Sequence, residues 1–553
     1  MILANEHAPA QPLIIFRSAQ WPVFLNTLRA AKEKYPENPV DVLAQPEAVD
    51  TVKEFGLARE VIAAKSRWFT FKSVDVPSLK AKGYRMAVVP VSDRFAEGYF
   101  TVFALAWLMA KEAYWSHSKG GFEPITIAVL LDLLTRSARR WILTVLSLLV
   151  LPAALILAVM TRLVHRRGRY QLLYIANDSW QDPLVLSHSL AWIKKTGQRA
   201  VFASFEGRIE LNANIPFPLD DAVRIESRFD PNMHRMLICA LPKLTLAAAI
   251  HGVRTTHARS YGPAFIAAIL KKTLGLRFVF DTRGAWMEEN ILSGYYNTRP
   301  ISRNLDMAMT RAAFGCADHV IAVGEAHAAL LSKNYEMPRP PVIITCSVDT
   351  DHYAKAAELR DVYREKLGFS GMRVAGYSGS AVHYQSPELV ARLMAQLTAQ
   401  DPDTRGLILS QDAAWFESLL RMSGADPARV RLMSPQRDEL AAYTSCMDCA
   451  LLLRKPAEAI DIGLPSKFAE YLAAGVPALA SGNQIDVARI LNQRDAGVLC
   501  DWDSLSVKTL AGALKTFTDD RAGYSARCMK AAADIFNIGN YSGVIKKLWD
   551  TDS

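Results

Sequence analysis

The amino-acid sequence predicts an α/β protein with doubly wound sheets and one segment long enough to cross a bilayer. Short apolar runs typical of buried parallel strands alternate with helical stretches along most of the chain. A single run of uncharged residues, 141–160, interrupts this alternation. Half of the 553 residues are apolar and 22% are charged, which suits several folded domains and excludes a disordered chain.

Charge and cysteine content narrow the possible partners. The 64 Lys and Arg residues exceed the 55 Asp and Glu residues by nine, a modest excess for this length, and we expect no nucleic-acid partner. Seven scattered cysteines are too few for a disulfide framework and favour a reducing compartment. Cys446 and Cys449 have metal or redox spacing but lack a second pair. We expect them to be core residues, with no metal site and no cofactor.

Residues 1–120 are expected to form a small α/β domain of their own. Strand-like runs lie at 13–16, 40–44 and 86–91, and helical stretches lie at 24–33 and 46–54. A further helix, rich in aromatic residues, is predicted over 98–115. No secretory signal peptide is visible in the first eleven residues.

Residues 121–168 are expected to associate with a membrane. As a helix, the twenty residues 141–160 would extend about 30 Å, the thickness of the hydrocarbon layer. A buried core helix is the alternative, but such helices seldom run this far without a polar face. Because arginines flank the segment on both sides, the charges do not fix its orientation, and a single span and a re-entrant helix both remain open. The apolar run 125–134 is expected to lie along the lipid surface.

The remaining sequence predicts two Rossmann-like domains, 169–352 and 353–553, joined by a charged helix at 354–366. The first is indicated by strand-like runs at 171–176, 199–205, 235–240, 253–257, 278–281, 319–323 and 342–345. The second is indicated by runs at 373–377, 406–410, 430–433, 449–453, 477–480 and 497–500.

Ligands of such sheets bind at the carboxyl ends of the strands, so residues just after strands are candidates for a site. Gly379 and Ser380 follow one strand, where free backbone N–H groups would attract phosphate; an ordinary tight turn is the alternative. Asp281 and Arg283 follow another strand. An arginine there suits bidentate contact with a phosphate, and a structural Asp–Arg pair is equally compatible.

The string LPSKFAEYLAAGVPALAS, residues 464–481, is more specific than any of its single residues. Pro465 and Ser466 start a helix that carries Lys467 and Glu470 one turn apart. A carboxylate at this place can accept hydrogen bonds from both hydroxyls of a ribose. The alternative is a Lys–Glu pair on the protein surface.

With these motifs in order, residues 170–550 resemble the group 1 class of retaining GT-B glycosyltransferases, which use nucleotide sugars. The matching pieces are THARSYGPA, FDTRGAWMEE, ADHVIAVG, CSVDTDHY, GYSGS and PSKFAEYLAAGVPALAS. The resemblance implies two facing domains and a last helix, 530–549, that crosses back to the first. It implies that Glu470 binds the donor ribose and that Gly379 and Ser380 lie against the donor phosphates. His257, Asp281 and Arg283 would face the acceptor and are the candidate catalytic residues.

The sequence departs from the family at the donor. The first of two glutamates frequent in the family is replaced by Ile462, and the usual Arg and Lys are absent from the glycine loop. Arg437, Arg454 and Lys467 are candidate substitutes, and Arg454 and Lys467 are predicted donor ligands. Residues 1–120 resemble, more weakly, the N-terminal half of heptosyltransferase-type enzymes. They lack the acidic residue of the first loop and are expected to be non-catalytic.

We therefore expect a membrane-associated glycosyltransferase that moves a sugar, with retention, to a lipid-linked or envelope polysaccharide acceptor. Its place would be the cell inner membrane, with the catalytic domains on the cytoplasmic side. Two alternatives remain open at this point. One is a nucleotide-sugar epimerase on the same fold, and the other is a non-catalytic membrane scaffold of a glycan-assembly complex.

Overall fold

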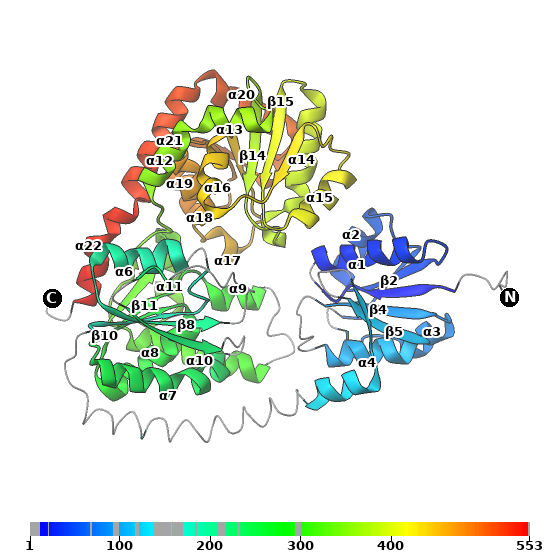
Figure 1. Ribbon diagram of the computed structural model, residues 1–553, viewed down its shortest axis with the longest axis horizontal. Helices are drawn as coiled ribbons and strands as arrows, with labels where there is room; N and C mark the ends of the chain where they lie inside the picture. Colours follow the sequence, from blue (N-terminus) through cyan, green and yellow to red (C-terminus); the bar gives the residue numbers. More distant parts are fainter. Residues whose placement is uncertain are drawn as a thin grey trace. The chain divides into compact units, whose positions relative to one another are not determined.

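A computed structural model of the chain describes residues 11–19, 21–66, 69–91, 99–116, 121–135, 156, 170–182, 185–206, 217–219, 222–228, 233–292 and 300–550. The chain divides into two compact units, Met1–Val145 and Leu146–Ser553. The first unit contains one β-sheet and the second contains two (Figure 1).

The sheet of the first unit has the order β3-β2-β1-β4-β5-β6, with only β6 antiparallel among the described strands. Its strands are β1 (Leu13–Phe16), β2 (Val40–Ala44), β3 (Glu60–Ala63), β4 (Met86–Pro90), β5 (Glu112–Ser116) and β6 (Phe122–Pro124). Its helices are α1 (Trp21–Lys34), η1 (Pro46–Ala48), α2 (Val49–Glu54), α3 (Val76–Ala81) and α4 (Phe100–Met109), and residues 127–135 are also helical.

The single helix predicted over residues 98–115 is wrong in its second half. The helix α4 ends at Met109, where Ala110 is already extended with φ −127° and ψ 162°. The next residues form β5, which pairs with β4 through Val88 and Tyr114. Aromatic residues such as Tyr114 and Trp115 favour a strand, and this pairing outweighs the apolar pattern that had suggested a helix.

The second unit contains an N-lobe, residues 170–345 together with the terminal helix α22, and a C-lobe, residues 346–537. The N-lobe sheet is parallel and has the order β13-β12-β11-β10-β7-β8-β9. Its strands are β7 (Leu172–Ala176), β8 (Ala200–Glu206), β9 (Val223–Arg228), β10 (Thr255–Arg259), β11 (Arg277–Asp281), β12 (His319–Ala322) and β13 (Val342–Ile343). Its helices are η2 (Val185–Leu190), α6 (Ala191–Thr196), α7 (Met233–His251), α8 (Tyr261–Leu274), α9 (Trp286–Leu292), α10 (Pro300–Cys316) and α11 (Glu325–Asn334).

One predicted strand of the N-lobe is wrong, and one strand was not predicted. Residues 235–240 belong to the 19-residue helix α7 rather than to a strand. A short apolar run cannot be assigned to a strand or a buried helix by periodicity alone, and here the longer run is helical. The unpredicted strand is β9, which pairs only with β8 among the described strands and alternates apolar with charged residues.

The C-lobe sheet is also parallel, in the order β16-β15-β14-β17-β18-β19. Its strands are β14 (Arg373–Ser378), β15 (Thr404–Leu409), β16 (Val430–Met433), β17 (Cys449–Leu452), β18 (Ala478–Ser481) and β19 (Gly497–Cys500). Its helices are α12 (Thr350–Glu358), α13 (Arg360–Leu367), η3 (His383–Gln385), α14 (Pro387–Gln400), α15 (Ala413–Met422), α16 (Arg437–Ser445), α17 (Glu458–Asp461), α18 (Ser466–Ala473), α19 (Ile485–Arg494), η4 (Trp502–Ser504), α20 (Val507–Asp519) and α21 (Arg521–Ile535). The connector predicted as one helix at 354–366 is thus two helices, α12 and α13.

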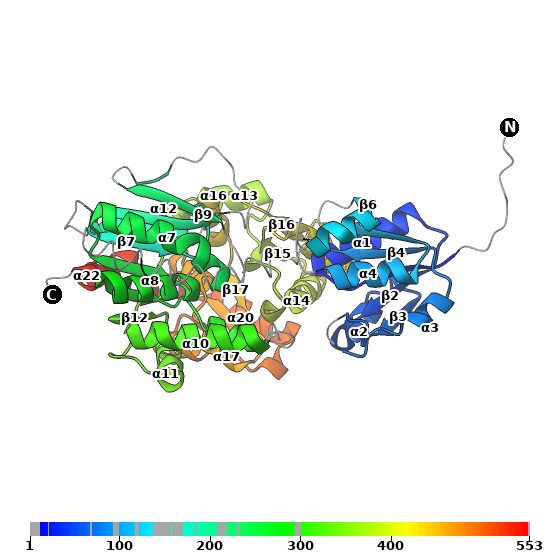
Figure 2. The same ribbon diagram turned by 90° about the horizontal axis from the view of Figure 1, so that it is seen from below.

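The last helix, α22 (Ile538–Trp549), leaves the C-lobe and packs on the N-lobe. It contacts α6, β10 and β11, and Figure 1 and Figure 2 both show it against that lobe. Ile538, Ile545 and Leu548 are buried in the same core cluster as Leu172 of β7. The residues predicted as one crossover helix, 530–549, are therefore shared between α21 and α22.

Direct contacts also join the two lobes at α11 and α19. The Asp486 carboxylate of α19, 1% exposed, accepts a 3.1 Å hydrogen bond from the backbone N–H of Ala326. A Cβ atom at Gly324 would lie 2.2 Å from the same carboxylate, so only glycine fits there. Nearby, Ile462 packs against Ala285 and Leu330 of the N-lobe. A buried carboxylate at a helix N-terminus is well placed to bind that helix.

The predicted membrane segment 141–160 lies outside the described residues, apart from Ile156. Within the part of the chain that the structure describes, no helix combines the length and the apolar character needed to span a bilayer.

A buried carboxylate anchors the strands at the amino end of the C-lobe sheet. Asp448, 4% exposed, accepts hydrogen bonds from Arg360 and Arg364 at 2.5 Å each, from Arg521 at 3.1 Å and from the backbone N–H of Val374 at 2.9 Å. Removing one partner of a buried ionic network leaves uncompensated charge behind.

We predict that Asp448→Asn lowers the free energy of unfolding by about 3 kcal/mol. The three guanidinium groups would lose the only negative charge that the described structure gives them. Thermal and denaturant unfolding of the full chain would measure the loss. Asp519→Asn, which removes a solvent-exposed partner of Lys515, is the matched control and should change stability by less than about 0.5 kcal/mol. Equal effects of both variants would contradict this reading of Asp448.

Candidate active site

In the C-lobe, the turn after β14 lies next to a buried lysine. Gly379 has φ +143°, and a Cβ there would lie 3.2 Å from the Lys467 Nζ and 3.1 Å from the Gln385 Oε1. The Lys467 ammonium donates a hydrogen bond to Gln385 Oε1 and lies 4.2 Å from the centroid of the Tyr377 ring. Ser380 is exposed, and its carbonyl accepts a 2.7 Å hydrogen bond from Tyr377. Glycine therefore lets the backbone approach a cation closely.

The local sequence explains why Lys467 is held there. Pro465 precedes α18, and Lys467 is the second residue of that helix. Burial lowers the pKa of Lys467 well below its usual value, the Arg454 charge lowers it further, and Glu470 raises it. An anion placed beside the ammonium would favour its charged form.

Arg454 is the second cation at this edge of the sheet. It follows β17, and its guanidinium lies 5.4 Å from the centroid of the Tyr384 ring. Its Nε atom is buried and has no hydrogen-bond partner among the described residues. Burial lowers the pKa of Arg454, while Tyr384 and Glu289 raise it. A half-buried guanidinium whose Nε has no partner is suited to an oxyanion.

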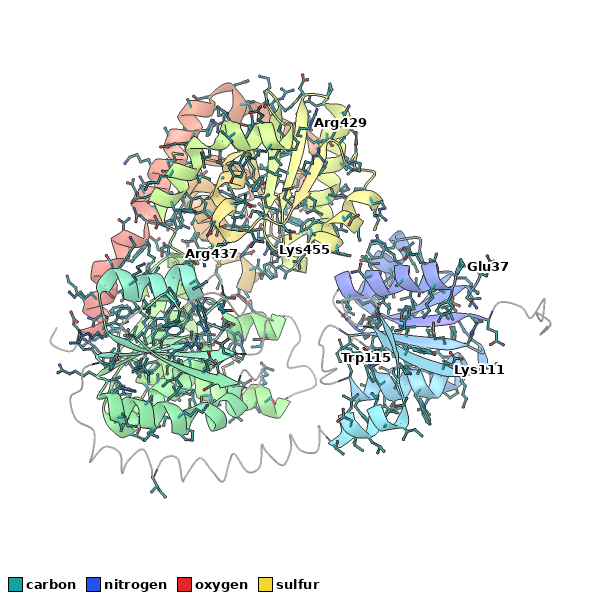
Figure 3. All side chains as sticks on the ribbon, in the orientation of Figure 1. Glu37, Lys111, Trp115, Arg429, Arg437 and Lys455 are labelled. Atoms are coloured by element: carbon teal, nitrogen blue, oxygen red, sulfur yellow. The ribbon has the colours of Figure 1, made fainter. Side chains whose placement is uncertain are left out.

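Glu470 lies one helical turn beyond Lys467 on the same helix. Its half-buried carboxylate makes none of the side-chain hydrogen bonds formed among the described residues. Burial raises its pKa, and the charges of Lys467 and Arg437 lower it. Arg437 begins α16; Figure 3 shows it with Lys455 at one end of the C-lobe and Arg429 at the other. Arg437 and Lys455 therefore lie at the same end of the lobe as the carboxyl ends of the strands.

In the N-lobe, three predicted residues come together: His257 in the middle of β10, Asp281 at the end of β11 and Arg283 just after it. The Asp281 Oδ2 lies 3.7 Å from His257 Nε2 and 4.0 Å from Arg283 Nη1. Asp281 and His257 are fully buried, and Arg283 is 12% exposed and has φ 60°. Neither Asp281 oxygen has a hydrogen-bond partner among the described residues. A buried carboxylate in this state can accept hydrogen bonds from a ligand or from water.

The charge states of this cluster follow from its surroundings. Burial raises the pKa of Asp281, but Arg283 and His257 outweigh it, so the pKa lies below its usual value and the carboxylate is ionised. Burial lowers the pKa of His257 more than Asp281 raises it, and the imidazole is neutral near pH 7. The cluster is thus a carboxylate beside a neutral histidine.

Cys346, in the connection between the lobes, interacts both with Arg283 of the N-lobe cluster and with Arg454 of the C-lobe. The Arg283 Nη2 lies 3.8 Å from its Sγ, and Arg454 also interacts with it electrostatically. On the N-lobe side, Glu289 has a pKa that burial raises and Arg454 lowers. Gly379, Ser380, Arg454, Lys467 and Glu470 belong to one end of the C-lobe, and His257, Asp281 and Arg283 form a separate cluster in the N-lobe.

Some residues of the site could not be recognised in the sequence. Gln385, which binds Lys467, follows Gly379 by six residues in a stretch without a motif. Glu289 stands in the quoted string FDTRGAWMEE, but nothing in the string singles it out from Glu288. Cys446 and Cys449 are fully buried, and burial raises the pKa of both thiols. Among the described residues, no group of three His, Cys, Asp or Glu is arranged to hold a metal ion.

An architecture of two lobes, each built on a parallel doubly wound sheet, is that of the GT-B class of α/β proteins. Residues 191–352 match the model of Glycosyltransferase Family 4, which confirms the resemblance and the expectation of a glycosyltransferase. No curated protein matches the chain significantly by sequence.

Solved structures share this fold. Sucrose-phosphate synthase from Thermosynechococcus elongatus has a TM-score of 0.55 at 15% identity, covering 69% of this chain and 98% of that one. The Anabaena protein HepE, solved in complex with UDP and glucose, has a TM-score of 0.53 at 13% identity, covering 68% and 99%. WaaG, a glycosyltransferase involved in lipopolysaccharide biosynthesis, has a TM-score of 0.51 at 15% identity, also covering 68% and 99%. At these identities the likeness shows the fold.

We predict that Lys467→Met raises the stability of the unliganded chain by about 1 kcal/mol at pH 7. The folded-state pKa of Lys467 is lowered, so the wild-type charge costs stability below that pKa, and the cost fades as the pH rises toward the unfolded value. The gain from Lys467→Met should therefore be largest at low pH and shrink in alkaline buffer. Melting curves with and without pyrophosphate would measure it.

The same variant should lose the stabilisation that pyrophosphate gives the wild type. Lys455→Met, which alters an exposed lysine at the same end of the lobe, is the matched control and should change neither the melting temperature nor the pyrophosphate shift. A destabilised Lys467→Met that still responds to pyrophosphate would contradict the role of an anion ligand.

Proposed function

We propose that this chain is a membrane-associated glycosyltransferase that transfers a sugar from a nucleotide-sugar donor to a lipid-linked or polysaccharide acceptor, with retention. The observation that carries this proposal is the pair of cationic side chains, the buried Lys467 and the half-buried Arg454, beside the Gly379 turn, with Glu470 one helical turn beyond Lys467. Lys467 is buried and Arg454 half-buried, and neither forms a salt bridge with a carboxylate among the described residues, so a bound anion would find two incompletely paired cationic groups there.

A nucleoside diphosphate satisfies each of these groups. Its phosphates would neutralise Lys467 and Arg454 and accept a hydrogen bond from the backbone N–H of Ser380. The Gly379 N–H, expected from the sequence to be free, instead donates to the Leu409 carbonyl at 3.0 Å, so Gly379 contributes close backbone approach rather than a donor. Its ribose hydroxyls would donate to the Glu470 carboxylate. HepE, which shares the fold, has been solved with UDP and with UDP-glucose, and this supports the proposal.

The reaction would break the bond between the sugar anomeric carbon and the diphosphate and form a bond from that carbon to an acceptor hydroxyl. The proton of the hydroxyl would leave with the nucleoside diphosphate. Lys467 and Arg454 would stabilise the negative charge that grows on the leaving group. Asp281, His257 and Arg283 would line the acceptor side, where an ionised Asp281 can orient a hydroxyl. Retention of configuration is carried over from the family resemblance.

Membrane association is supported by the sequence 141–160 and by the helix that precedes it. In the helix 127–135, the side chains of Ile127, Leu131 and Leu134 are 59%, 55% and 47% exposed. Their spacing of four and three residues puts them on one face. Leu133, on the other face, is buried in the core of the first unit. An exposed apolar face beside an apolar, arginine-flanked segment suits the surface of a bilayer. We place the protein at the inner membrane, with its catalytic lobes on the cytoplasmic side.

We predict that Glu470→Gln raises the KM for the nucleotide sugar, or the Kd for its nucleoside diphosphate, by about ten- to a hundredfold. The amide cannot accept two hydroxyl hydrogen bonds as a carboxylate does. Calorimetric titration of the purified chain with UDP, GDP and their sugar conjugates would measure the change. Glu417→Gln, an exposed glutamate of α15, is the matched control. Unchanged affinity in Glu470→Gln would overturn the ribose assignment.

The same preparation distinguishes the proposal from its alternatives. Incubation with a panel of nucleotide sugars and a membrane extract should release nucleoside diphosphate and label the lipid fraction. Interconversion of two nucleotide sugars without release would indicate an epimerase. Binding without any turnover would indicate a scaffold.

We predict that the double variant Ile127→Glu, Leu131→Glu weakens binding to anionic vesicles by at least about tenfold, because two charges would replace apolar surface at the lipid boundary. Leu359→Glu, Val362→Glu is the matched control, since both residues are exposed aliphatic side chains of the C-lobe. Vesicle co-sedimentation of detergent-free protein would measure the effect. Full binding by the first variant would exclude this face as a membrane contact.

A further inference from the structure

The last helix donates a hydrogen bond into the N-lobe cluster. The Trp549 Nε1 lies 3.0 Å from His257 Nδ1, and both side chains are buried, with 3% and 0% exposure. An indole N–H can only donate a hydrogen bond, so His257 Nδ1 must accept it and carries no proton. A neutral imidazole has one proton, which therefore resides on Nε2.

The surrounding rings hold the imidazole in this orientation. Tyr174 stacks on His257 with centroids 4.4 Å apart and planes 13° apart, and Trp549 meets its edge at 5.8 Å. The Tyr174 hydroxyl is itself fixed by a 2.8 Å hydrogen bond to Ser189. The imidazole is therefore packed between fixed neighbours, and rotation of the ring would disturb both contacts.

The protonated nitrogen is the one beside Asp281. His257 Nε2 has no hydrogen-bond partner among the described residues, and Asp281 Oδ2 lies 3.7 Å away. A movement of about half an ångström would make this contact a normal N–H···O hydrogen bond. In the other tautomer a nitrogen lone pair would face the carboxylate, which is repulsive.

We propose that Trp549 is a positioning residue of the N-lobe site, because its indole N–H holds His257 as the Nε2–H tautomer that supports the Asp281 carboxylate. The inference deepens the proposed function and rests on it where it concerns the reaction. The end of the chain would thus act on the orientation of Asp281, a residue 268 positions earlier in the sequence.

The charged groups around His257 come from three neighbouring strands and their loops. Arg259 lies on the same strand and pairs with Asp178, after β7, at 3.0 Å. Asp281 and Arg283 face the ring from the end of β11, while Tyr174 of β7 is neutral because burial raises its pKa.

The indole N–H opposes protonation of His257. Burial and the two arginines lower the pKa of the imidazole, and Asp281 raises it. A proton on Nδ1 would have to displace the indole N–H. Loss of that N–H should therefore raise the pKa of His257 and admit a charged imidazolium beside Asp281.

Trp549→Phe tests the proposal, and Trp192→Phe is its matched control. Trp192 is equally buried and its ring lies 6.4 Å from His257, but its Nε1 has no hydrogen-bond partner among the described residues. Long-range proton–nitrogen spectra of the full chain with ¹⁵N-labelled histidine report the tautomer, and His257→Asn identifies the signal. At pH 7 the wild type and Trp192→Phe should show an unprotonated Nδ1, and Trp549→Phe should show a tautomer mixture that becomes protonated at a higher pH than the wild type does.

Kinetics give the second measurement. Trp549→Phe should lower kcat about tenfold, leave the donor KM unchanged and move the acidic limb of the pH profile upward, while Trp192→Phe should do none of these. Benzothienylalanine at position 549 keeps the bicyclic shape without the N–H and repeats the test if Trp549→Phe fails to fold. An unchanged tautomer and pH profile in both 549 variants would overturn the proposal. Absence of turnover in the wild type would instead overturn the proposed function, and the spectra would still decide the tautomer.

Discussion

Two segments of the chain cross between the lobes, and they are hydrogen-bonded to each other. Val348, on the way into the C-lobe, donates its N–H to the Phe536 carbonyl at 2.8 Å and accepts from Ile538 at 3.0 Å on the way back. The Asn537 side chain adds a 2.7 Å bond to Thr350. Because the two crossings are paired, α22 enters the N-lobe from a defined point. The docking of α22 and its contact with the N-lobe site both depend on this pairing.

The chain buries charged side chains in two different ways. Asp448 is also buried, but four donors bind its carboxylate, which is therefore fully paired within the chain. Lys467 has a single amide oxygen and an aromatic face, and Asp281 has no hydrogen bond among the described residues. A fold selected only for stability would satisfy such groups or replace them. Their incomplete bonding therefore distinguishes Lys467 and Asp281 from the fully paired Asp448.

The sequence predicts the positions of the strands better than the contacts between residues that are far apart in the chain. Strands at 13–16, 40–44, 430–433 and 497–500 agree with the structure to the residue, since each has turn residues or a change of polarity at its ends. The strand β9 was not predicted, because its residues alternate between apolar and charged and form no continuous apolar run. The positions of Lys467 and Glu470 follow from a recognisable helix start. The partnership of Trp549 with His257 joins residues 292 positions apart, and no local pattern encodes it.

The two lobes provide different electrostatic environments at their candidate site residues. The C-lobe edge brings together cations, Lys467 and Arg454, around a backbone turn that only glycine fits, and this environment favours an anion over a neutral group. The N-lobe cluster keeps an ionised carboxylate beside a neutral imidazole, which favours a hydrogen-bond donor such as a hydroxyl. In the proposed reaction, the leaving diphosphate and the incoming hydroxyl need opposite environments, and a single lobe with one dominant charge would disfavour one of them. Placing the two environments on separate lobes would resolve this conflict, but it requires that the two lobes keep a fixed relative position. The paired crossings at Val348 and the contact of Asp486 with α11 hold the lobes in that position.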